Sequence, residues 1–160
     1  MAPVVKRVFL SWCHADHRPK AALVTALAVE LKILSGVRLE LWDDSRIKNG
    51  EEWPRRLLAQ LTACDYGLLL LSPGFLASDF IAEHELPHFV GPSATNGVLP
   101  VGLQRVALDG SRTLRGVERH QIFTMGSDRR FFTEIRDAAG RQRFVRELAT
   151  AIRDRVLGDS

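Results

Sequence analysis

An uninterrupted apolar run from Tyr66 to Leu71 constrains the fold of this chain more than any other segment. The run lacks polar alternation, so a strand there must be covered on both faces, which is typical of a central strand in a parallel sheet. Helical patterns at Arg18–Ser35 and Glu51–Ala63 precede it, the second with Trp53 as an expected anchor on its inner face. Strands that alternate with helices indicate right-handed βαβ units. We therefore expect an α/β fold with a parallel sheet.

The remaining patterns complete a three-layer arrangement. We expect further strands at Val4–Leu10, Val37–Leu41 and Val98–Leu103, a short fifth strand at Gln121–Thr124, and helices at Ser78–Phe89 and Arg141–Leu157. Pro87 should distort or end the helix in which it lies, because proline lacks the amide hydrogen that continues a helix. The expected fold is flavodoxin-like, with a central parallel sheet of about five strands and helices on both faces.

Length and composition indicate one domain, residues 1–160, with a core at residues 7–157. No apolar run approaches the roughly 20 residues of a membrane span, and the N-terminus does not resemble a signal peptide. Two cysteines cannot form a disulfide framework, so we expect a cytoplasmic protein. The net charge is +3, and acidic residues interleave with the arginines that follow Leu103. This favours a solvated surface, and we expect neither a nucleic-acid nor a membrane partner.

Polar residues gather where strands are expected to end. Ser11 and Trp12 follow the first strand, and a helix with Glu83 and Glu85 comes soon after the apolar run. In open α/β sheets, ligands bind outside the carboxyl ends of the strands. A carboxylate placed there can hold ribose hydroxyls and stabilise an oxocarbenium-like transition state. The alternative is that both glutamates are solvated residues near a helix N-terminus, where the helix dipole favours them.

Residues around the first strand end also have two interpretations. Trp12 either stacks on a planar ring of a ligand or packs as a lid on the core, and Ser11 can hydrogen-bond a substrate. Cys13, His14 and His17 are metal-ligand residue types, but they lack a clear fourth ligand, so we expect no metal site.

Four segments, in this order and spacing, resemble the TIR (Toll/interleukin-1 receptor) domain family, and the resemblance extends from Val8 to about Val156. The segments are Val8–Trp12, Leu41–Gly50, Leu69–Pro73 and Ser78–Leu86. The second is similar to the family's BB loop. The fourth is similar to the helix that carries the catalytic glutamate of bacterial-type TIR enzymes that cleave NAD.

The resemblance implies NAD glycohydrolase or cyclase activity, with NAD as substrate and no separate cofactor. Many family members place the catalytic glutamate four residues after a tryptophan, whereas bacterial members with Ser-Asp-aromatic place it one residue later. With Phe80 at the aromatic position, this spacing favours Glu85 as the catalytic residue, with Glu83 as runner-up. The residues expected to shape the substrate pocket are Ser11, Trp12, Asp43, Arg46, Ser72 and Ser78.

The resemblance also implies partners. Family members associate with one another through the loop that corresponds to Trp42–Gly50, and a neighbour's loop completes the active site. We therefore expect self-association, partners among other TIR-containing or sensor proteins, and a role in defence or cell death. Two alternatives remain, a non-catalytic TIR–TIR module that scaffolds a signalling complex, and a nucleoside-processing transferase of similar fold.

Overall fold

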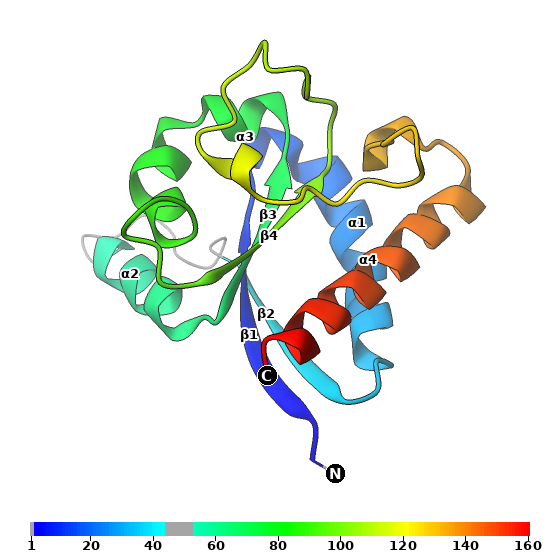
Figure 1. The fold of residues 1–160 in the computed structure, drawn as a ribbon, viewed down its shortest axis with the longest axis horizontal. Coiled ribbons are helices and arrows are strands. Elements are labelled where there is room, and N and C mark those ends of the chain that lie inside the picture. Colours follow the sequence, from blue (N-terminus) through cyan, green and yellow to red (C-terminus); the bar gives the residue numbers. More distant parts are fainter. Residues whose placement is uncertain (1, 44–52) are drawn as a thin grey trace.

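The computed structural model describes residues 2–43 and 53–160. Its central sheet consists of parallel strands in the order β2-β1-β3-β4 (Figure 1). The strands are β1 (Val4–Ser11), β2 (Val37–Asp43), β3 (Tyr66–Leu71) and β4 (Gly97–Gly102). This is the strand order of the expected flavodoxin-like fold. In that fold β2 is added on one side of β1 and the later strands on the other side, so the topological switch point lies between β1 and β3.

The expected fifth strand at Gln121–Thr124 is wrong, and the sheet of the described residues has four strands. Phe123 alone pairs with β4, through a bridge to Val101. Its N–H donates to the carbonyl of Pro100 over 2.8 Å, and its carbonyl accepts from the N–H of Gly102 over 2.9 Å. Three residues later the chain reverses through a turn that begins at Gly126, with φ 78°, so the pairing cannot continue.

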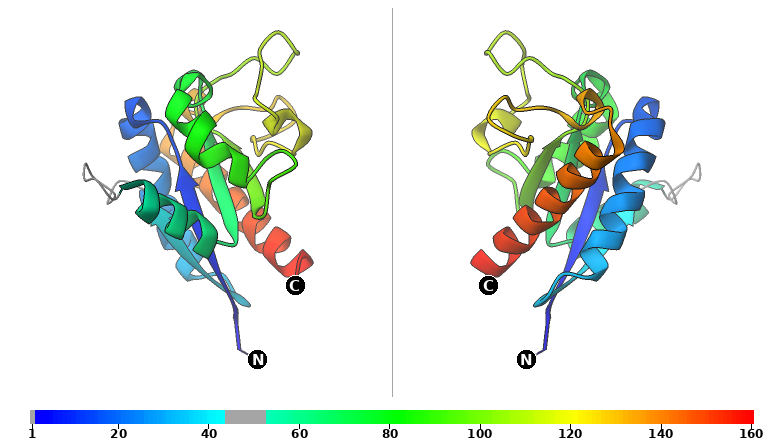
Figure 2. Two further views of the ribbon diagram at one scale, coloured as in Figure 1. Left: turned by 90° about the vertical axis from the view of Figure 1, so that its left-hand side faces the viewer. Right: turned by 90° about the vertical axis from the view of Figure 1, so that its right-hand side faces the viewer.

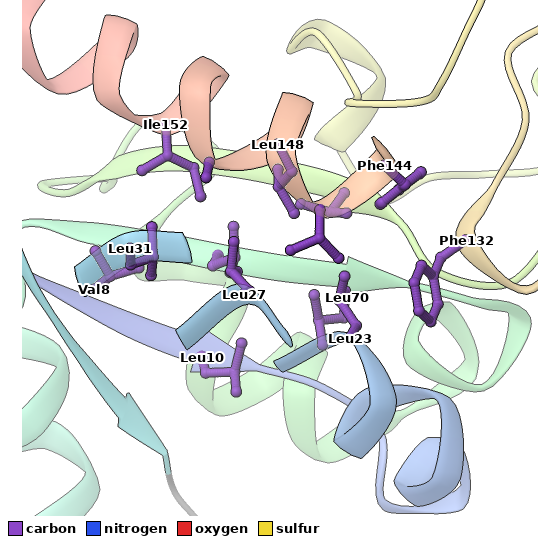
Figure 3. Close-up of a cluster of buried hydrophobic side chains, with 14 of the residues drawn as sticks. Val8, Leu10, Leu23, Leu27, Leu31, Leu70, Phe132, Phe144, Leu148 and Ile152 are labelled. Carbon is purple, nitrogen blue, oxygen red and sulfur yellow. The ribbon is translucent and has the colours of Figure 1, made fainter. Parts of the chain in front are cut away.

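Two long helices cover one face of the sheet, α1 (His17–Lys32) and α4 (Ala138–Gly158). Both were expected, with bounds that differ by one to three residues. Their apolar stripes meet the side chains of β1 and β3 that point toward this face. Figure 3 shows this core, formed by Val8, Leu10, Leu23, Leu27, Leu31, Leu70, Phe144, Leu148 and Ile152.

Shorter helices cover the opposite face, as Figure 2 shows from two sides. They are α2 (Trp53–Ala63), α3 (Pro73–Ala77), the π-helix η3 (Ile81–Glu85) and the 3₁₀ helix η4 (Leu86–His88). Gly67 of β3 permits close packing here, because a Cβ atom at this position would lie 2.4 Å from the ring of Phe89.

The single α-helix expected at Ser78–Phe89 is replaced by the η3 and η4 turns. The N–H of Leu86 donates to the carbonyl of Ile81, five residues back, which is the hydrogen bond of a π-helix. Pro87 then has no N–H to donate, and the chain leaves the segment through one 3₁₀ turn. The expected distortion at Pro87 is thus confirmed, whereas the helix type and α3 were not foreseen.

Strand β2 continues two residues beyond its expected end, so Trp42 and Asp43 belong to the sheet and not to the following loop. Phe9 and Leu10 of β1 are their partners in register. The rest of the expected loop, which includes Arg46, lies outside the described residues. None of the helices within the described ranges has the length and apolarity needed to cross a membrane.

Candidate functional site

A cavity of about 440 Å³ lies beyond the carboxyl ends of β1 and β3. Its walls come from the turn after β1, the start of α2, and the segment that runs into η3. The lining residues are Trp12, Cys13, His14, Ala15, Trp53, Leu57, Ser78, Phe80, Ile81 and Glu85. The volume is typical of a small-molecule site, and the position between β1 and β3 is where flavodoxin-like sheets bind their ligands.

Glu85 is the carboxylate of this cavity. Its side chain is fully buried, as is that of Ser11 at the end of β1. The Ser11 hydroxyl donates to Glu85 Oε1 over 2.6 Å, a short hydrogen bond that fixes the carboxyl group. Burying a carboxylate is costly unless other groups compensate for the lost water. The fold therefore keeps the Glu85 carboxyl group in the wall of a cavity although its burial costs free energy.

The π-helical turn explains how Glu85 reaches the cavity that Phe80 also lines. In an α-helix of 3.6 residues per turn, the residue five positions after Phe80 points to a different side. A π-helical turn contains about one residue more, so the fifth residue returns closer to the side of the first. Such turns occur often at functional sites. The five-residue spacing between Phe80 and Glu85 is therefore matched by the local backbone.

Glu83 has a different environment. Its side chain is 72% exposed, and its Oε2 lies 3.9 Å from Nε2 of His84. Glu83 is not among the residues that line the cavity. Of the two glutamates singled out in the sequence, the structure thus brings Glu85 to the cavity and leaves Glu83 in solvent.

Trp12 is held in the cavity wall by Asp43 and Lys20. The indole Nε1–H donates to Asp43 Oδ1 over 2.9 Å, and Lys20 Nζ donates to Asp43 Oδ2 over 2.7 Å. The Lys20 ammonium also lies 4.3 Å from the centre of the Trp12 ring, within cation–π distance. Asp43 does not line the cavity itself. It instead orients a residue that does.

Ser72 belongs to a hydrogen-bond network that includes Asp16, the residue after Ala15 of the cavity wall. Its hydroxyl donates to Asp16 and accepts from the N–H of Phe75, which caps α3. The second oxygen of Asp16 accepts from the side-chain amide of Gln104 over 2.6 Å. The network therefore ties the turn after β1 to the segments that follow β3 and β4. Ser72 does not line the cavity, and Asp16 was not foreseen from the sequence.

Ser78 lies in the cavity wall, and its hydroxyl accepts from the N–H of Ile81 over 3.2 Å at the start of η3. The N–H groups in the first turn of a helix have no carbonyl partner within the helix, and the Ser78 hydroxyl serves as the acceptor for one of them. Ser78 thus joins Trp12 and Glu85 as the sequence-derived candidates that line the cavity, whereas Ser11 acts on it through its hydrogen bond to Glu85.

A second group of aromatic residues in the cavity wall was not foreseen from the sequence. Trp53 lines the cavity beside Phe80, with ring centres 5.3 Å apart, and His84 packs against both rings. The signal in the sequence was an aromatic residue in the first turn of α2, which equally suits a helix anchor. His14 contacts Trp12 with ring centres 5.0 Å apart. Aromatic residues from three segments therefore line the cavity, which suits a ligand with a planar ring.

Cys13 and His14 also line the cavity, and Cys13 is a free thiol. Among the residues that the structure describes, no group of three or more histidine, cysteine, aspartate or glutamate side chains is arranged to hold a metal ion.

The chain was compared with models of known protein families. A family model described as TIR domain matches residues 8–136 of the chain, a span that includes β2, β3, β4, the second half of β1, the cavity and the buried network. No curated protein shows significant similarity to the chain.

Proposed function

The chain belongs to the TIR domain family, and on that premise we propose that it cleaves NAD at the bond between nicotinamide and ribose. The observation that supports this function best is the Glu85 carboxylate, fully buried and fixed by Ser11 in the wall of a 440 Å³ cavity. The site combines the fixed carboxylate of Glu85 with aromatic walls. NAD carries two planar ring systems, and its nicotinamide-bearing ribose becomes positively charged as the bond to nicotinamide breaks.

The chemistry needs little beyond this carboxylate. As the glycosidic bond breaks, its electron pair moves to the nicotinamide nitrogen, whose positive charge disappears, and the ribose becomes oxocarbenium-like. Glu85 stabilises that developing positive charge, as a carboxylate does in sugar hydrolysis. Water then attacks the anomeric carbon and loses a proton to solvent, which gives nicotinamide and ADP-ribose. If the adenine of the same molecule attacks instead, a cyclic ADP-ribose forms.

The neighbouring residues have supporting roles in this proposal. Ser11 orients the carboxylate, and Trp12 provides a flat surface that Asp43 holds in place. Ser78 fixes the start of the π-helix and can offer its hydroxyl to the substrate. Ser72 acts through the buried network with Asp16. For Arg46 we retain the sequence-based proposal of a substrate contact.

The activity is proposed to depend on self-association, because TIR domains generally associate with one another or with other TIR proteins. The loop at Trp42–Gly50 is the proposed contact, and other TIR-containing or sensor proteins are the proposed further partners. The free thiols of Cys13 and Cys64 suit a reducing cytoplasm. Such an enzyme fits a defence or cell-death pathway that depletes NAD.

The test is NAD consumption by the purified chain at high protein concentration, with separation of nicotinamide, ADP-ribose and cyclic products. Glu85→Gln is the informative variant, because its amide oxygen can still accept from Ser11 while the negative charge is lost. Glu83→Gln is the matched control, with the same change two residues away on an exposed side chain. We expect release of nicotinamide by the wild type and the control, and none by Glu85→Gln.

Three results would contradict the proposal. Full activity in Glu85→Gln would exclude Glu85 as the catalytic residue. Absence of nicotinamide release from the wild type, even with two copies joined by a tether, would favour the non-catalytic scaffold. Exchange of the base on free nucleosides without cleavage of NAD would favour the transferase.

A further inference from the structure

A second groove, of about 410 Å³, lies against the same helical segment that carries Glu85, but on a different side of it. Ala82 of η3 and Leu86 of η4 form part of one wall. The other wall belongs to the long connection after β4, which Figure 1 shows passing over the end of the sheet, and contributes Arg115, Arg119 and His120. None of these residues lines the Glu85 cavity, so the groove is a separate feature.

The ionisable side chains that line this groove are all basic. Within the described part of the chain, the guanidinium groups of Arg115 and Arg119 form no ion pair with a carboxylate. The acid between them in sequence, Glu118, accepts from the backbone N–H of Gly116 over 3.2 Å. A concave surface with charge of one sign attracts small ions of the opposite sign.

Arg115 is held in position by the fold. Its backbone has φ 54°, in the left-handed region that side chains other than glycine rarely adopt. Its Nε–H donates to the carbonyl of Leu76 over 2.6 Å, so the guanidinium is anchored to the end of α3. An arginine has five N–H donors, and anchoring by one of them leaves others for a ligand. A fixed guanidinium suits the two-point binding of a phosphate group.

Apart from Ser93, the other side chains that line the groove are apolar. Leu86, Pro87, Val90 and Pro92 line it beside the basic residues, which provides a surface for a flat or apolar group next to an anion-binding wall. Its volume is in the range of small-molecule sites. We propose that this groove binds a nucleoside diphosphate, with the phosphates on Arg115, Arg119 and His120 and the nucleoside over the apolar residues. The proposal does not depend on NAD cleavage.

The experiment is a titration of the isotope-labelled chain with ADP, followed by NMR. The backbone amides of Gly91, Ser93 and Gly116 report on the groove, and the indole N–H of Trp12 reports on the Glu85 cavity. We expect saturable shifts of the groove signals, and a dissociation constant at least tenfold higher in Arg115→Ala and Arg119→Ala. Arg112→Ala is the matched control, an exposed arginine of the same connection that donates to Ser111 and does not line the groove.

Pyrophosphate and adenosine, titrated separately, should each bind more weakly than ADP, because each contacts one part of the groove. Shifts confined to the Trp12 indole would overturn the proposal, since ADP would then occupy the Glu85 cavity only. An equal loss of affinity in the Arg112→Ala control would also overturn it, because binding would then reflect general attraction to a basic surface. A preserved amide spectrum in each variant shows that the variant is folded.

Discussion

The two faces of the sheet are built in different ways. On the face covered by α1 and α4, two helices of 16 and 21 residues contribute regular apolar stripes to a core of leucine, phenylalanine and β-branched side chains. On the other face, α2 has 11 residues, and α3 and η3 have five each. This second face holds the cavity, the buried Glu85 and the π-helical turn.

The difference indicates a division of labour between the faces. Regular helices over an apolar core supply stability, because burial of apolar surface is the dominant favourable term in folding. Buried carboxylates and unusual helical turns cost free energy, and proteins tend to concentrate such features at functional sites. The face with short helices contains both features, next to the cavity. We therefore expect substitutions on the two faces to affect stability and activity in opposite proportions.

The largest expected effect is the loss of Phe144 from the α1–α4 face. Its ring is fully buried and packs edge-on against Phe123 and Phe132, with ring centres 5.1 Å and 5.4 Å away. Phe144→Ala should lower the free energy of unfolding by about 3–5 kcal/mol, as for other buried phenylalanines. Urea unfolding followed by circular dichroism measures this loss.

Phe80→Ala is the matched control from the other face, because the ring of Phe80 is 41% exposed and lines the cavity. We expect it to cost less than about 1 kcal/mol of stability, while it weakens the binding of NAD. Equal stability losses in the two variants would remove the distinction between the faces.

An intermediate effect is expected at Asp16, because its hydrogen bonds join the turn after β1 to the segments that follow β3 and β4. Asp16→Ala leaves the buried hydroxyl of Ser72 and the half-buried amide of Gln104 without their acceptor, which should cost about 1–3 kcal/mol. Asp16→Asn should cost less, since its amide oxygen can still accept from Gln104. Thermal unfolding of the two variants compares them. If both lose the same stability, the charge of Asp16 matters and not its hydrogen bonds alone.

Regular periodicity made the α1–α4 face predictable from sequence. Leu23, Leu27 and Leu31 recur at helical spacing in α1, and Phe144, Leu148 and Ile152 do so in α4, so both helices could be placed within three residues of their bounds. The apolar run Tyr66–Leu71 identified the central strand for the same reason. In each case one local pattern determines both the element and the face that it buries.

The cavity face was less predictable because its features depend on contacts distant in sequence. The π-helical turn at Ile81–Glu85 has no periodic signal, and it was expected as an ordinary helix. Asp16 accepts from residues 56 and 88 positions away, which no local pattern reveals. Trp53 was expected only as a helix anchor. Its position next to Phe80 depends on packing between α2 and the segment that leads into η3, which the sequence does not reveal. The prediction of a fifth strand was wrong for a similar reason, since the chain turns at Gly126 after a single bridge to β4.

The smallest expected effect concerns the two thiols, which lie on the same face in different surroundings. Cys13 is partly exposed in the cavity wall, whereas Cys64 is 5% exposed. Burial, followed by the negative charge of Asp65, raises the pKa of the Cys64 thiol to about 11 from an ordinary value of 9.0. Between these values the unfolded chain loses this proton and the folded chain keeps it, so stability should fall as the pH rises from about 9 to about 11.

Cys64→Ala isolates the contribution of this thiol. At pH 10 the wild type should lose about 1 kcal/mol more, relative to pH 8, than the variant does, as measured by urea unfolding at the two pH values. Some loss should remain in the variant, because burial and the hydrogen bond to Asp159 raise the pKa of Tyr66 to about 12. Alkylation of the native protein with iodoacetamide should modify Cys13 before Cys64, since only the thiolate reacts. Faster modification of Cys64 would show that this part of the face opens more readily than the cavity wall.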